Sequence, residues 1–141
     1  MIKKDSRPQR GLKPEDLVCL RWVFGSHDDF SAVVNIYVGF DSNLKLIIFC
    51  EWTDYDYPAY NCATWAELSR HEAYRLARRL KVSLEELPGE ICECMSDWHE
   101  MHCPLPSDAV NCFGEIVDCL VAEGCHFKIH RRAGRYGMIP C

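Results

Sequence analysis

The side chains best suited to bind a metal are concentrated in one short segment, residues 92–103. This segment contains three cysteines and two histidines. If it is helical, Cys92, His99 and either His102 or Cys103 fall on overlapping faces, which gives three or four candidate ligands. Zinc prefers four thiolate or imidazole ligands in a tetrahedron, so these residues could bind a zinc ion. In common zinc fingers two well-separated ligand pairs hold the metal, and that spacing is absent here. The alternative interpretation is a helix that is simply rich in cysteine and histidine.

A second cluster, of tyrosines and aspartates, lies in residues 52–60. The residues that we select from it as a candidate partner-binding surface are Trp52, Asp54, Tyr55, Asp56, Tyr57 and Tyr60. Aromatic rings often form the centres of protein interfaces, because they cover a large area at a small loss of rotamer entropy. The carboxylates beside them favour a partner with a basic surface. The alternative is that some of these rings belong to the core.

Three arginines near the end of the sequence, Arg131, Arg132 and Arg135, lie beside a turn that contains Gly134. Guanidinium groups hold phosphates through paired N–H donors, so this segment could bind a phosphate or a nucleotide. The alternative is a basic hairpin that pairs with acidic residues of the preceding helix.

The ten cysteines do not by themselves indicate disulfides or catalysis. The N-terminal residues do not resemble an export signal, so we expect a cytoplasmic protein with reduced thiols. With ten cysteines and six histidines, proximity of a thiol and an imidazole is expected by chance, and no glycine-framed nucleophile turn is present. The sequence therefore favours a non-enzymatic protein and predicts no cofactor other than the candidate zinc ion.

The charge distribution is uneven along the chain. The net charge is −5, and residues 91–124 contain seven acidic residues and no lysine or arginine, whereas residues 1–21 and 125–141 are basic. An acidic body repels nucleic acid and attracts a basic partner. Because no run of about 18 apolar residues occurs, we expect no membrane-spanning helix.

The elements that position these residues begin with three segments rich in β-branched and aromatic residues, 17–24, 30–38 and 44–52. Short turns separate them, which predicts an antiparallel meander. Apolar residues then recur at helical spacing in 69–80, 90–102 and 107–123, which predicts three helices. A capping pattern at 64–67 would let the first of these helices begin before residue 69. Residues 125–130 and 135–139 are typical of a closing hairpin.

The sequence thus predicts a single α+β domain over residues 1–141, with residues 1–13 as a flexible arm. An antiparallel sheet, built from the N-terminal three-stranded meander plus the C-terminal hairpin, is covered on one face by about three helices. The leading hypothesis is a small acidic protein that acts by non-catalytic binding of a macromolecule. Examples are an inhibitor, an immunity-type protein or a phage-type blocker of a basic, nucleic-acid-handling partner protein.

Two alternatives to this hypothesis remain. The first is a zinc-binding module or small enzyme centred on residues 92–103, and the second is a phosphate- or nucleotide-binding protein that uses the basic C-terminal hairpin. The expected contact face combines the tyrosine-rich loop with the carboxylates of residues 93–123, and the sequence predicts no oligomeric state.

Overall fold

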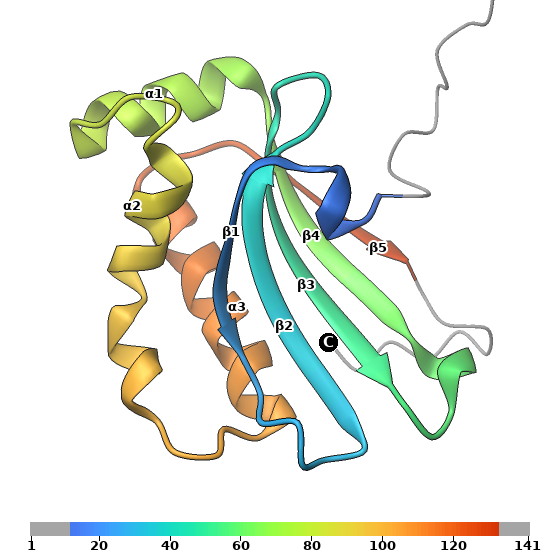
Figure 1. The fold of residues 1–141 in the computed structure, drawn as a ribbon. Helices are drawn as coiled ribbons and strands as arrows, with labels where there is room; N and C mark the ends of the chain where they lie inside the picture. Colours follow the sequence, from blue (N-terminus) through green and yellow to red (C-terminus); the bar gives the residue numbers. More distant parts are fainter. Residues whose placement is uncertain (1–11, 133–141) are drawn as a thin grey trace, which may run out of the picture.

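A five-stranded antiparallel sheet with helices against one face forms the architecture of the chain (Figure 1). The computed structural model describes residues 12–132. In space the strands follow the order β1-β2-β3-β4-β5, so each strand pairs with its neighbours in the sequence. The strands are β1 (Val18–Gly25), β2 (Ala32–Phe40), β3 (Leu46–Asp54), β4 (Cys62–Leu68) and β5 (Lys128–Arg132). The helices are α1 (Arg70–Leu80), α2 (Leu87–Cys94) and α3 (Pro106–Ala122), and the 3-10 helices are η2 (Pro14–Asp16), η3 (Pro58–Tyr60) and η4 (Ser96–Glu100). The predicted α+β fold is confirmed.

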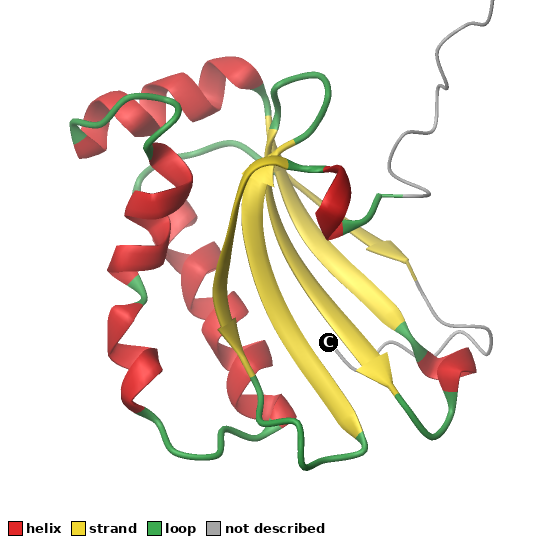
Figure 2. Ribbon diagram, viewed as in Figure 1, coloured by secondary structure: helices red, strands yellow, loops and turns green. Residues whose placement is uncertain are grey.

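The main core lies between the sheet and the helices, which are grouped on one side of it (Figure 2). Val34, Ile36 and Val38 of β2 alternate toward this side and are fully buried, as the alternation in the sequence predicts. Ile91 and Met95 of the α2 region and Ile116 of α3 pack against them. None of the helices within residues 12–132 is long and apolar enough to cross a membrane.

The strand β4 corrects the sequence prediction, which allowed a helix to begin at residues 64–67. All seven residues of β4 are buried, because β3 and β5 pair with its two edges and both faces of the sheet are covered there. A strand buried on both faces shows no alternation of polar and apolar residues. Pairing with its neighbours therefore overrides a local sequence that also suits a helix.

The helix boundaries also differ from the prediction in the region after α1. Ser69 does cap α1, since its Oγ accepts a hydrogen bond from the backbone N–H of Glu72 at 3.1 Å. The predicted helix over residues 90–102 is instead two elements, α2 and η4. Pro88 lies in the first turn of α2, a position that needs no N–H donor.

The predicted terminal elements are only partly within the described residues. β5 corresponds to the first strand of the predicted C-terminal hairpin, and it pairs with β4. The second strand, over residues 135–139, lies outside the described residues, as does most of the predicted arm. Leu12, which the prediction placed in that arm, is buried against the sheet.

Candidate functional site

The face of the sheet opposite the helices, which we call the open face, carries rows of side chains that cross the strands. The register places Trp22 beside Tyr37, and it aligns Tyr37 with Phe49, Trp65 and His130 on the following strands. A neighbouring row consists of Asn35, Glu51, Ala63 and Arg132. On this face the side chains over β3 and β4 are covered by other parts of the chain, whereas several of those over β1 and β2 are exposed.

The part of the open face over β3 and β4, which we call the covered half, holds a second small core. The N-terminal segment, residues 12–17, lies over Ile47, Phe49, Ala63 and Trp65, with η2 in front of the sheet (Figure 1). The rings of Phe49 and Trp65 stack with centroids 5.3 Å apart, and both residues are almost fully buried. A guanidinium N–H of Arg132 donates to the carbonyl oxygen of Leu12 at 2.7 Å, which holds the segment in place.

A charged network borders the covered half at the end of β4. Lys45 Nζ lies 2.9 Å and His130 Nε2 lies 2.6 Å from the carboxylate of Glu67, whose side chain is 6% exposed. Burial alone would raise the pKa of Glu67, but the hydrogen bonds from Lys45 and His130 outweigh it and hold the pKa below its usual range. Nearby, Glu72 accepts a backbone N–H from His126 and lies 3.2 Å from Arg75, and the first of these contacts is the main cause of its lowered pKa.

A pocket of about 350 Å³ lies between Glu67 and Glu72, with Lys45 and Lys128 also in its lining. Both carboxylates are already paired with donors from the protein. The pocket therefore offers no buried carboxylate that lacks a counter-charge, and we interpret the network as structural.

The other part of the open face, over β1 and β2, contains a groove of about 570 Å³, which we call the aromatic groove. It is lined by the end of β1, residues 25–28, β2, Tyr55 and the segment after η4. Trp22 is 52% exposed and Tyr55 is 66% exposed, although both have large apolar rings. Among the described residues that line the groove, Asp28 is the sole carboxylate, and none is lysine or arginine.

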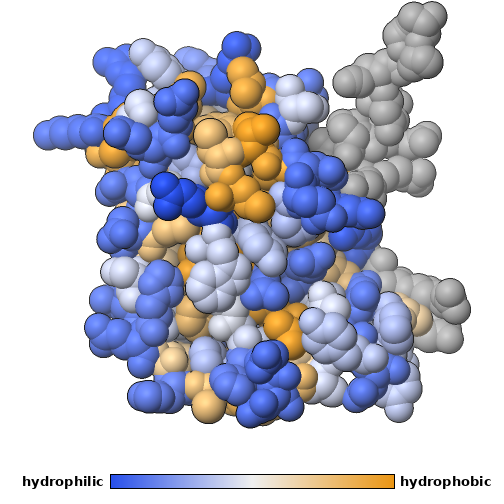
Figure 3. Space-filling model, in the orientation of Figure 1, coloured by the Kyte–Doolittle hydropathy of each residue, from blue (hydrophilic) through white to orange (hydrophobic). Residues whose placement is uncertain are grey.

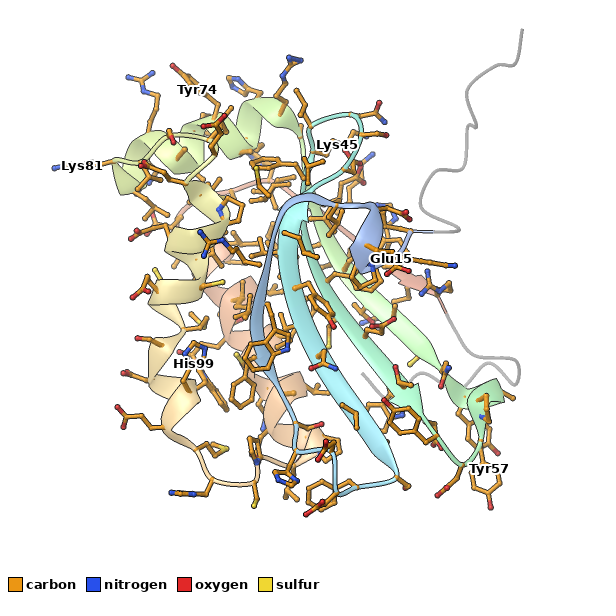
Figure 4. All side chains as sticks on the ribbon, in the orientation of Figure 1. Glu15, Lys45, Tyr57, Tyr74, Lys81 and His99 are labelled. Carbon is orange, nitrogen blue, oxygen red and sulfur yellow. The ribbon has the colours of Figure 1, made fainter. Side chains whose placement is uncertain are left out.

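Trp22 is held in a fixed position at the groove. Its Nε1–H donates to Asn35 Oδ1 at 2.9 Å, and its ring stacks on His99 with an interplanar angle of 14°. His99 also stacks on Phe24, and its Nε2–H donates to the carbonyl oxygen of Val23 at 2.6 Å. The side chain of His99 extends from η4 toward β1 (Figure 4), so it covers part of the edge of β1 and limits pairing by another strand.

Apolar surface continues from the groove along β1. Figure 3 shows hydrophobic atoms gathered over the start of this strand. Val18 and Leu20 are both exposed there. Together with Trp22 they form a row of exposed apolar side chains on one strand, a feature that often marks a contact site.

No protein-family model, curated protein or solved structure matches this chain.

The residues of the predicted zinc site are not gathered around one point. His99 Nε2 is bonded to Val23, and the thiol of Cys92 lies 3.7 Å from the carbonyl oxygen of Trp22. His102 and Cys103 are exposed in the segment that follows η4. Within residues 12–132 a single group of three metal-ligand side chains has its ligand atoms within 4.8 Å, and it is a different one: His27, Asp28 and Asp29. His27 Nδ1 already accepts the backbone N–H of Asp29 at 3.1 Å.

The residues of the predicted partner-binding loop divide into structural and exposed groups. Trp52 packs against the main core, and Asp54 Oδ1 accepts the backbone N–H groups of Asp56 and Tyr57 at 3.0 and 2.8 Å. Tyr55 and Tyr57 are the exposed rings, and Tyr57 lies 5.7 Å from the ring of Tyr60. The β3–β4 hairpin and α2 lie on opposite sides of the molecule (Figure 1), so the loop and all the acidic residues of 93–123 do not form one face.

Two arginines of the predicted phosphate site, Arg131 and Arg132, point in different directions. Arg131 and Arg132 are successive residues of β5, so their side chains lie on opposite faces of the sheet. Arg132 contacts Leu12 and lies over the rings of Phe49 and Trp65 at 5.9 Å from each centroid. Arg135 lies outside the described residues.

No pattern in the sequence marks Trp22, Asn35 or Glu51 as residues of a site. Trp22 and Asn35 are 13 residues apart and meet only through the β1–β2 register. That register includes two irregularities in β1, which no local pattern in the sequence indicates.

Proposed function

We propose that this protein is a non-catalytic binding protein that holds a basic protein partner in the aromatic groove. The observation that carries the proposal is that Trp22 and Tyr55, each more than half exposed, line one groove. The lining residues that the structure describes include a carboxylate and no lysine or arginine. Such rings contribute strongly to protein interfaces, because they bury a large area with few rotatable bonds. The charge of the groove favours a partner with a basic surface.

The loop beside the groove adds to this charge. Asp28 and Asp29 lie next to His27, with their own side chains largely exposed, at 3.7 and 3.4 Å from the imidazole. Carboxylates exposed at the rim of an interface raise the association rate of a basic partner more than they raise its affinity. An inhibitor of a basic, nucleic-acid-handling enzyme would use such a surface, because carboxylates can occupy positions that otherwise hold phosphates.

The test measures binding of labelled oligo-arginine, oligo-lysine and oligo-glutamate peptides of equal length by fluorescence anisotropy. We expect the two basic peptides to bind, with an affinity that falls as salt rises, and the acidic peptide not to bind. Combined Trp22→Ala and Tyr55→Ala substitutions should weaken binding of the basic peptides by about tenfold or more.

Tyr74→Ala is the matched control, since Tyr74 is also an exposed tyrosine but lies on α1, far from the tip of the β3–β4 hairpin at Tyr57 (Figure 4). It should leave the affinity unchanged. The proposal is wrong if no basic peptide binds, or if Tyr74→Ala weakens binding as much as the substitutions in the groove.

A further inference from the structure

Glu51 lies next to the aromatic groove on the open face of the sheet. It is directly opposite Asn35 of β2, the residue that lines the groove and accepts the indole N–H of Trp22. Side chains that are directly opposite on neighbouring strands lie about 4.5–5.5 Å apart at their Cβ atoms. A group bound over Asn35 is therefore within reach of both Trp22 and Glu51.

The carboxylate of Glu51 is not paired with any hydrogen-bond donor of residues 12–132. On its other side it faces Ala63, whose methyl group cannot donate a hydrogen bond, and Arg132 comes one strand later. Within residues 12–132 Glu51 makes no hydrogen bond or ion pair, although it is half-buried. Burial raises the pKa of Glu51, and the nearby charge of Arg132 only partly opposes this effect.

We propose that the aromatic groove selects arginine over lysine, with the guanidinium group of a partner stacked on Trp22 and hydrogen-bonded to Glu51. This inference rests on the proposed function and adds the chemical group that the groove recognises. A guanidinium is planar, so it can stack on an indole while it donates two parallel N–H bonds to one carboxylate. A lysine ammonium is more strongly hydrated and has no flat face, so it gains less from the same two partners.

The fixed position of Trp22 favours this arrangement. The hydrogen bond to Asn35 and the stack on His99 hold its ring in place before any partner binds. A preformed surface loses little conformational freedom when it binds. Tyr55 also lines the groove and offers a second exposed ring to the partner.

The experiment compares labelled oligo-arginine with oligo-lysine of equal length, on the full chain and on two variants. We expect the full chain to bind oligo-arginine about tenfold more tightly than oligo-lysine. Glu51→Gln, which keeps the shape of the side chain, should reduce this ratio to about twofold or less. Trp22→Leu, which keeps an apolar side chain and removes the flat ring, should reduce it as well.

Glu93→Gln is the control for net charge, because Glu93 is exposed on α2 and its substitution removes one negative charge at a different place. It should leave the arginine preference intact. Equal binding of both peptides to the full chain would overturn the arginine selection and leave the proposed function standing. If neither peptide binds the full chain, both the arginine selection and the proposed function are overturned. If Glu51→Gln lowers the affinity for both peptides by the same factor, the inference is also overturned, since Glu51 would then act only through its charge.

Discussion

The two tryptophans on the open face of the sheet, Trp65 and Trp22, have opposite environments. Trp65, in the covered half, is 1% exposed under the N-terminal segment and the side chain of Arg132. Trp22, in the aromatic groove, is 52% exposed. Both belong to the same row of cross-strand neighbours, but Trp22 lies on the edge strand β1, outside the part of the sheet that the N-terminal segment covers.

The carboxylates of the two regions differ in the same way. Glu67, beside the covered half, is paired with Lys45 and His130, whereas Glu51, beside the groove, has no hydrogen-bond or ion-pair partner in residues 12–132. In the covered half the chain supplies both the apolar cover and the counter-charges. Within residues 12–132 it supplies neither in the groove, and this contrast is the reason why we propose binding there.

Substitution of the two tryptophans by alanine gives the largest expected contrast. Trp65→Ala removes a fully buried side chain and should lower the free energy of unfolding by about 3–5 kcal/mol. Trp22→Ala should lower it by about 1 kcal/mol, because the ring is half exposed and makes one hydrogen bond to Asn35. Urea unfolding measures both, and similar losses in the two variants would contradict the distinction between the two regions.

Trp65→Phe refines this comparison. Within residues 12–132 the buried indole N–H of Trp65 has no hydrogen-bond partner, so its removal deletes no bond in this part of the chain. The phenylalanine variant should therefore retain much of the stability that the alanine variant loses.

Glu67→Gln tests whether the charged network stabilises the covered half. The amide keeps the shape but leaves Lys45 and His130 without their anion, so we expect a loss of about 2 kcal/mol at neutral pH. Because the pKa of Glu67 is lowered on folding, its contribution is present above the ordinary carboxyl pKa and is lost as the pH falls through the lowered value. Glu85→Gln, at an exposed position, is the control and should change little.

Gly39→Ala tests the close approach that lets the N-terminal segment cross onto the covered half. A Cβ atom at Gly39 would lie 2.9 Å from the carbonyl oxygen of Val18 and 3.0 Å from Leu17 Cβ. We expect a loss of about 1–2 kcal/mol, because the backbone of β1 must shift. Gly114→Ala in α3 is the matched control, since nothing lies within 4 Å of its added Cβ. It should gain about 0.5–1 kcal/mol from helix propensity, and a gain at Gly39 would show that β1 adapts freely.

The elements that can be predicted from the sequence are those whose signals lie within a few neighbouring residues. The alternation in β2, the cap at Ser69 and the break after α3 at Gly124 all have signals within a few residues, and each agrees with the structure. β4 has no such signal, because both of its faces are buried and its pairing with β3 and β5 decides its conformation. Burial from two sides removes the alternation on which strand prediction depends.

The candidate site was predictable only in part for a related reason. Tyr55 was selected from the cluster of tyrosines, and it does line the groove. The groove also requires Trp22, Asn35 and His99, which come from two strands and from η4 and meet only after folding. The spacing of His99 and Cys92 suggested a metal site, and in the structure each lies against a carbonyl oxygen of β1. Local spacing cannot separate an edge-covering side chain from a metal ligand.

Glu51→Gln has the smallest expected effect on the free energy of unfolding. The sign of this effect is opposite to that of Glu67→Gln. Since burial raises the pKa of Glu51 in the folded protein, the folded state retains a proton that the unfolded chain has already lost. Stability therefore falls as the pH rises from the ordinary carboxyl pKa to the raised value, and the glutamine variant should not show this fall. At neutral pH we expect the variant to be more stable by about 0.5 kcal/mol, and below the ordinary carboxyl pKa equally stable. A loss of stability at neutral pH would mean that the protein already provides Glu51 with a donor, in which case the groove would have no vacant carboxylate to offer an arginine.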